Sequence, residues 1–189
     1  MDQFSYLSVL LSLIVGLAIT QILKGYRGLM LARRHVDLYW PSLVWSASLV
    51  LMNVQSWWAM FGLRDVQGWT FLLFTIILAQ TIVQYLLAAI VFPDFGAGRV
   101  DLREHYWSHT RWFFGLNVLV LLISLAKDLA LSGHFPDRIN LSFHLVFIGL
   151  AVMAVVTRNE WYHRLLAAML PLLFAAYVMV LFARLPQAN

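Results

Sequence analysis

Residues 145–156 read LVFIGLAVMAVV, and residues 71–78 read FLLFTIIL. Only Thr75 interrupts these two runs, and neither shows the alternation of apolar and polar residues that is typical of a barrel strand. In hydrocarbon, only a helix satisfies the backbone polar groups of such a segment without a partner. The two runs therefore predict helices that cross a membrane.

Similar apolar stretches fill most of the chain. A bilayer core of about 30 Å needs roughly 20 apolar residues per helix. Charged residues make up 12% of the chain, whereas a soluble domain has ~25%. We therefore predict an all-α integral membrane protein, a bundle of six transmembrane helices with short loops that forms a single domain over residues 1–189. The predicted helices cover residues 4–23, 39–63, 69–92, 112–131, 139–156 and 161–184.

Basic residues are distributed unevenly between the two sets of loops. Nine of the 13 Lys and Arg residues stand in or beside the first, third and fifth connections: Lys24, Arg27, Arg33, Arg34, Arg99, Arg103, Arg111, Arg158 and Arg164. Short loops rich in Lys and Arg stay in the cytoplasm. This bias predicts that both termini face outward, and it accounts for the net charge of +4 without a nucleic-acid partner.

The chain contains no cysteine, which excludes disulfides and thiolate metal sites. A small cysteine-free membrane protein fits the cell membrane of a bacterium, so we expect a multi-pass inner-membrane protein whose main partner is the lipid bilayer.

Small residues follow one another at four-residue spacing in the first predicted helix. They are Ser8, Ser12, Gly16 and Thr20. Such a face lets two helices approach closely, because lipid offers no hydrophobic drive for their association. We favour packing within the chain; the alternative is a seam with a second copy or with another membrane protein. On either interpretation, Gly16→Leu is expected to disrupt assembly.

Polar residues inside the predicted helices form a candidate site. They are Asn53, Gln80, Gln84, Lys127, Asp128 and His144. An ionisable residue within a membrane is a functional-site hypothesis by default, because its burial in lipid is costly. In the predicted topology, Asn53, Asp128 and His144 lie at similar depth and share an outward-facing cavity. The alternative is a Lys–Asp or His–Asp pair that only fastens helices together.

The stretch 100–109 is predicted either as a short amphipathic helix on the inner surface or as an ordinary loop. His105 and His109 are four residues apart, with Asp101 four before His105. Such spacing can bind a transition metal. Residues of this kind at an interface are more often solvated, and we predict no metal and no cofactor.

Three classes of function remain open. A small transporter or channel agrees with six helices around a polar cavity. A non-catalytic accessory or assembly subunit of a membrane complex agrees with the small-residue face and the absence of a soluble domain. An intramembrane enzyme would need a nucleophile with a base, paired carboxylates or a metal. Only Asp128 with His144 offers such a couple, so the sequence disfavours an enzyme.

Overall fold

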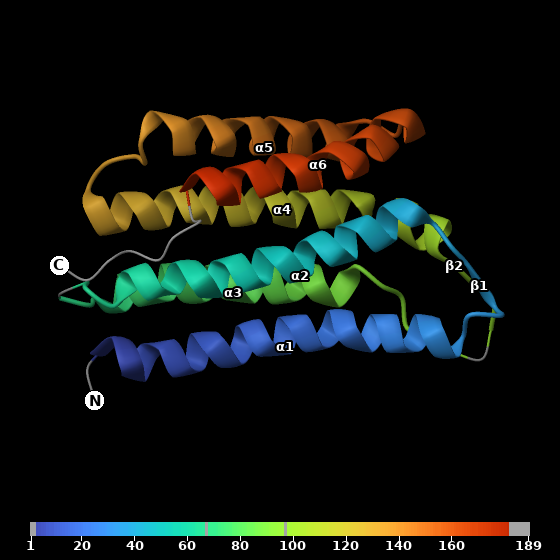
Figure 1. Cartoon of the computed structure of the whole chain (residues 1–189), viewed down its shortest axis with the longest axis horizontal. Coiled ribbons are helices and arrows are strands. Elements are labelled where there is room, and N and C mark those ends of the chain that lie inside the picture. Colours follow the sequence, from blue (N-terminus) through green and yellow to red (C-terminus); the bar gives the residue numbers. More distant parts are fainter. Residues whose placement is uncertain (1–2, 67, 97, 182–189) are drawn as a thin grey trace.

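The computed structural model describes residues 3–66, 68–96 and 98–181. Within them, six helices lie side by side and alternate in direction (Figure 1). They are α1 (Gln3–Leu31), α2 (Trp40–Met60), α3 (Phe71–Ile90), α4 (Leu102–Ser132), α5 (Arg138–Val156) and α6 (Glu160–Leu181). A 3-10 turn, η1 (Phe61–Leu63), follows α2, and two short strands are β1 (Val36–Asp37) and β2 (Val100–Asp101). The prediction of a helical bundle is confirmed.

Five of these helices are long and apolar enough to cross a membrane, namely α1, α3, α4, α5 and α6. They correspond to five of the six predicted spans. α2 differs because it buries a polar face that includes Ser42, Ser46 and Asn53, and these side chains lower its mean hydropathy. Figure 1 shows α2 running alongside the other helices. Its membrane crossing stays a prediction.

Two helices extend well beyond their predicted bounds. α1 continues past residue 23 to Leu31, so Lys24 and Arg27 belong to the helix rather than to a loop. α4 begins at Leu102 instead of residue 112 and reaches 31 residues, about 46 Å at 1.5 Å per residue. The stretch 100–109 is therefore neither a separate surface helix nor a loop, because most of it forms the first turns of α4.

The early start of α4 has a local cause. The Asp101 side chain accepts hydrogen bonds from the backbone N–H groups of Arg103 and Glu104, at 2.7 and 3.2 Å. It thereby satisfies two of the donors that a helix N-terminus leaves free. At the other end, Gly133 takes a left-handed conformation with φ 74° and closes α4 through a bond to the Leu129 carbonyl, as a C-terminal glycine commonly does.

The two strands tie the α1–α2 and α3–α4 connections together. They pair in parallel, with Val36 opposite Val100 and Asp37 opposite Asp101. The guanidinium of Arg99 bonds both carboxylate oxygens of Asp37, each at 2.8 Å. This charged hydrogen bond lowers the pKa of Asp37. We call this end of the bundle the strand end, and the opposite end, where α1 begins, the N-terminal end.

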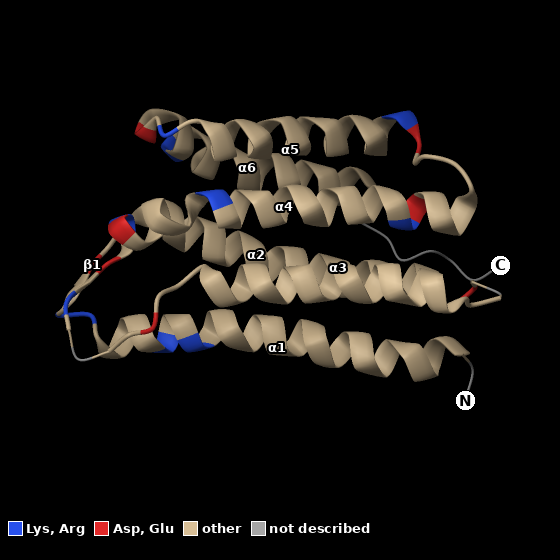
Figure 2. Ribbon diagram, turned by 180° about the vertical axis from the view of Figure 1, so that it is seen from behind, with Lys and Arg blue, Asp and Glu red and all other residues tan. Residues whose placement is uncertain are grey.

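Charge is concentrated at the ends of the bundle (Figure 2). The basic residues of the first, third and fifth connections lie toward the strand end. At this end, Glu160 pairs with Arg103 at 2.6 Å and with Arg164 at 2.8 Å. The basic set that the sequence assigned to one side of the membrane therefore shares one end of the structure.

α1 packs through a face other than the predicted small-residue ridge. The buried face carries Leu11, Val15, Ala18, Ile22 and Gly25. A Cβ atom at Gly16 would meet nothing within 4 Å, so Gly16 lies outside the contacts that α1 makes, and the role of the ridge stays a prediction. Gly16 and Thr20 are exposed, whereas Ser8 and Ser12 are half-buried.

The close approach of α1 to its neighbours occurs instead near the strand end. A Cβ atom at Gly25 would overlap the ring of Phe92, and one at Gly28 would overlap the ring of Phe95. These two phenylalanines follow α3 directly. The contact therefore holds the end of α1 against the segment that leads into β2.

Candidate polar cavity

A cavity of about 450 Å³ lies toward the N-terminal end of the bundle, between α2, α3, α4, α5 and α6. We call it the outer cavity. Its polar walls come from all five helices and from the residue that caps α5: Gln55, Ser56, Gln80, Thr81, Gln84, Ser124, Lys127, Asp128, Ser132, Asp137, Asn140, His144 and Tyr177. The outer cavity adjoins a deeper pocket of about 100 Å³, which we call the inner pocket. Gln84 and His144 line both spaces.

Five of the six predicted site residues line the outer cavity. They are Gln80, Gln84, Lys127, Asp128 and His144. Asn53 is not among the lining residues, although it is almost fully buried. Its Nδ2 atom donates to the Leu49 carbonyl one turn earlier, at 2.8 Å. Gln55 and Ser56 of the same helix reach the cavity in its place.

Gln84 connects α3 with α2 at the boundary between the two spaces. Its Nε2 atom donates to the Ser56 hydroxyl at 2.6 Å. Its Oε1 atom is buried without a hydrogen-bond partner among the described residues, and so is the Oδ1 atom of Asn140. Buried acceptors are normally satisfied. Two cavity residues therefore hold acceptors that a water or a solute hydroxyl could satisfy after a small side-chain rotation.

His144 connects α5 with α4. Its Nδ1 atom lies 3.0 Å from the Asn140 carbonyl, and its Nε2 atom lies 3.3 Å from the Ser124 hydroxyl. A carbonyl can only accept, so Nδ1 carries the proton, and in the neutral ring Nε2 accepts from Ser124. The ring is therefore oriented by two bonds on one wall of the cavity.

Lys127 and Asp128 form a charge pair on the wall of the outer cavity, which Asp137 also lines. Lys127 Nζ lies 3.9 Å from Asp128 Oδ1, and the side chains are 21% and 24% exposed. Both side chains line the cavity wall. The two charges offset each other, which lowers the cost of holding them within the bundle.

Several residues that line these spaces were not predicted from the sequence. Asn117, Asn140 and Tyr177 all line one of the two spaces. A signal did exist for two of them. Asn117 stands seven residues before Ser124, and Asn140 stands four before His144, so each pair shares a helix face. Tyr177 carried no such signal, because an aromatic residue near a helix end is also typical of a membrane interface.

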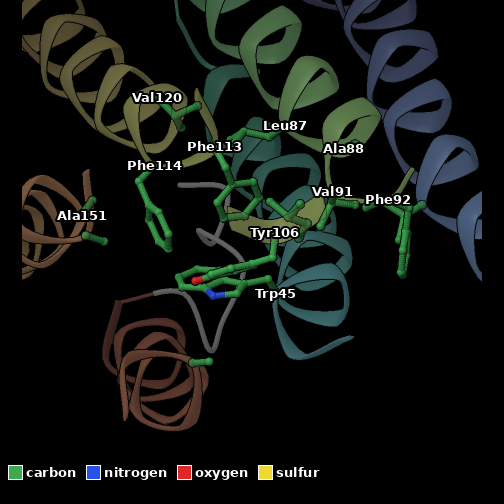
Figure 3. Close-up of a cluster of buried hydrophobic side chains, with 14 of the residues drawn as sticks. Trp45, Leu87, Ala88, Val91, Phe92, Tyr106, Phe113, Phe114, Val120 and Ala151 are labelled. Atoms are coloured by element: carbon green, nitrogen blue, oxygen red, sulfur yellow. The ribbon is translucent and has the colours of Figure 1, made fainter. Parts of the chain in front are cut away.

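The inner pocket ends at aromatic rings. Trp45 and Phe114 line its deep end, and Phe113 packs against both of them. Figure 3 shows these rings together with Tyr106. Tyr106 is buried, and it lies 2.8 Å through its hydroxyl from Nδ1 of the fully buried His163. Tyr39, whose ring lies beside that of Tyr106, is buried as well.

The His105–His109 pair lies on the strand-end side of these rings. The two rings are tilted by 33° to each other, with centroids 4.3 Å apart. His105 Nε2 contacts the Ile90 carbonyl at 3.0 Å, while Asp101 is occupied in capping α4. Within the described part of the chain, no three His, Asp or Glu side chains gather as a metal site would require.

The geometry of these spaces thus offers hydrogen bonding, one charge pair with a further carboxylate from Asp137, and an oriented imidazole, open toward one end of the bundle. Neither a family model, nor a curated protein, nor a solved structure matches this chain.

Proposed function

We propose that this protein is a small multi-pass transporter or channel whose outer cavity receives a polar solute. The observation that supports the proposal is the convergence of hydrogen-bonding side chains from five helices on a 450 Å³ cavity. Polar side chains are expensive within a membrane and are retained where they line a solute path or a binding site. Polar residues that only held the helices together would not require a cavity between them.

The distribution of basic residues supports a direction in which the outer cavity opens. The strand end carries the basic residues of the first, third and fifth connections, and such loops remain in the cytoplasm. In this orientation, α2 crosses the membrane with the other helices, both termini face outward and the outer cavity opens away from the cytoplasm. The proposed location is a cell membrane, and a bacterial inner membrane fits the composition.

The cysteine-free chain allows a direct test of the cavity. Single variants Gln80→Cys, Asp128→Cys and His144→Cys are reconstituted and exposed to a membrane-impermeant charged maleimide from one side. All three should react from the N-terminal end. Asn53→Cys is the matched control, because Asn53 is 1% exposed and does not line the cavity. Protection at all four positions would reject a water-filled cavity and leave a structural fastening.

A separate observation supports the second candidate, an accessory subunit. Gly16 faces open space on the surface of α1, and Ser8, Ser12 and Thr20 share its stripe. Such a surface suits a close contact with another transmembrane helix. Gly16→Leu should then abolish a complex that is stable in mild detergent, while the thermal stability of the isolated chain stays unchanged. A monomer that behaves identically with and without the substitution contradicts this candidate.

A further inference from the structure

A second, smaller pocket lies beyond the deep end of the inner pocket. It has a volume of about 20 Å³, which is enough for about one water molecule. Its walls include Thr110, His105 and His109 of α4, and it lies on the strand-end side. Trp45 lines this strand-end pocket and the inner pocket alike. The indole ring therefore separates two spaces that approach each other from opposite ends of the bundle.

The separating layer is a compact aromatic trio. Trp45 meets Phe113 and Phe114 edge to face, with ring centroids 5.3 and 5.1 Å apart. Phe113 and Phe114 are themselves 5.2 Å apart at 89°. All three side chains are buried. Figure 3 shows the three rings close together among the helices.

One face of α4 carries polar residues on both sides of this layer. Thr110 lines the strand-end pocket, while Asn117 and Ser124 line the inner pocket. The three follow one another at seven-residue spacing, so they lie on one stripe of the helix. Thr110 donates to the Tyr106 carbonyl at 2.6 Å and Asn117 to the Phe113 carbonyl at 2.9 Å. These bonds hold both side chains in place along the stripe.

Charge is confined to the outer cavity. Among the described residues, neither the inner pocket nor the strand-end pocket is lined by Asp, Glu, Lys or Arg. An ion that entered these spaces would lose hydration without meeting an opposite charge, at a cost of several kcal/mol. A small uncharged molecule with hydroxyl or amide groups would instead exchange its water for the Gln84, Asn117 and Ser124 side chains.

We propose that the α4 stripe is the wall of a single path for small uncharged hydrogen-bonding solutes, such as glycerol or urea. The path joins the outer cavity to the strand end, and the rings of Trp45, Phe113 and Phe114 close it. This inference rests on the proposed function and adds the solute class and the position of the barrier. It also assigns Trp45 a role as the barrier residue, which touches the path from both sides.

The first test measures solute flux across proteoliposomes by light scattering, with glycerol and urea as probes. Trp45→Ala should raise both fluxes about tenfold, which corresponds to a barrier lower by about 1.4 kcal/mol. Sodium flux should remain at the level of empty liposomes. Trp57→Ala is the matched control, since Trp57 belongs to the same helix but is 55% exposed. Equal fluxes in the two variants would overturn the proposal, and a rise in sodium flux would overturn the solute class.

The second test asks whether the layer separates the two spaces. Ser124→Cys should react with an impermeant maleimide only from the N-terminal end, and Thr110→Cys only from the strand end. Adding Trp45→Ala should make position 110 reactive from both ends. If position 124 reacts while position 110 never becomes reactive from the N-terminal end, the path is refuted and the cavity stands. If position 124 reacts from neither end, the proposed function fails as well.

Stability of the variants is checked by their thermal midpoints in detergent. Should Trp45→Ala not yield a folded protein, Phe114→Leu thins the same layer while it keeps most of the apolar volume. Its expected effect on glycerol flux has the same direction and a smaller size. No increase in a folded Phe114→Leu protein would count against the barrier.

Discussion

The two ends of the bundle are built differently. At the strand end, Gly25 and Gly28 admit the rings of Phe92 and Phe95, and a buried Tyr106–His163 pair lies among aromatic side chains. At the N-terminal end, the helices stand around a cavity of 450 Å³ with Lys127 and Asp128 on its wall. The first end is closed by side-chain packing, whereas the second keeps space among polar groups.

This difference indicates that the two ends of the bundle have different roles. A closely packed region resists any change of volume, because its contacts have no room to relax. A region that already contains a cavity tolerates changes in its lining with little loss of stability. We therefore expect substitutions at the strand end to affect folding, and substitutions around the outer cavity to affect solute binding.

The largest effect is expected at Gly25. Gly25→Leu forces a side chain into the ring of Phe92, which should destabilise the protein by about 3 kcal/mol or more. Gly16→Leu is the matched control, because a Cβ atom at Gly16 meets nothing within 4 Å. The measurement is the thermal midpoint in detergent. Equal midpoints for the two variants would remove the packing contrast along α1.

Two buried histidines allow the closely packed strand end to be compared with the cavity wall by mutation. His163→Ala leaves a void and a Tyr106 hydroxyl without its partner, so we expect a loss of about 1–3 kcal/mol. His144→Ala should cost less, because water in the adjoining cavity can bond the Ser124 hydroxyl. Chemical denaturation of both variants gives the two free energies of unfolding. A larger loss for His144→Ala would show that the cavity wall is the more tightly packed region.

The charge pair should separate stability from function. Lys127→Met alone leaves Asp128 without its partner, and we expect a loss of about 1 kcal/mol because both side chains are partly exposed. The double variant Lys127→Met with Asp128→Leu should recover the stability, since replacing both charges by apolar groups is often neutral. Labelling at Gln80→Cys reports whether the cavity stays wet. A double variant less stable than the single one would contradict this account.

The smallest effect is expected at the Asp37–Arg99 pair, which is exposed. Arg99 lowers the pKa of Asp37, so the pair stabilises the folded state above the ordinary carboxyl pKa. The contribution disappears as the pH falls through the lowered value. Asp37→Asn should therefore change the thermal midpoint slightly at neutral pH and not at all in strong acid. If the difference in thermal midpoint between the unchanged protein and Asp37→Asn instead grew toward acid pH, the pKa of Asp37 in the folded state would be raised and not lowered.

Part of the site could be read from the sequence, and the reason lies in helix geometry. Gln80 and Gln84 are four residues apart, so their common face follows from the helix period alone. Whether that face meets His144 depends on the rotation of each helix about its axis. Asn53 shows the limit of prediction from the helix period. Its neighbours Gln55 and Ser56 reach the cavity, while the Asn53 side chain bonds its own helix.

Local signals were also present where the sequence reasoning missed them. Asp101 followed by Glu104 is a helix-start pattern, and it explains why α4 begins ten residues before the apolar run at Trp112. Gly25 and Gly28 are likewise visible in the sequence. Their partners Phe92 and Phe95 lie far along the chain, so nothing local distinguished these glycines from Gly16.

The sequence by itself determined that the chain forms apolar helices and that nine of its 13 basic residues belong to the same set of connections, because hydropathy and charge act residue by residue. Only the tertiary structure decided which faces meet, where α1 packs and where the cavity lies. Lipid and the bundle interior are both apolar, so an apolar side chain is equally suited to either. The choice between them is made by shape and by the pairing of polar groups, which arise only when the helices are together.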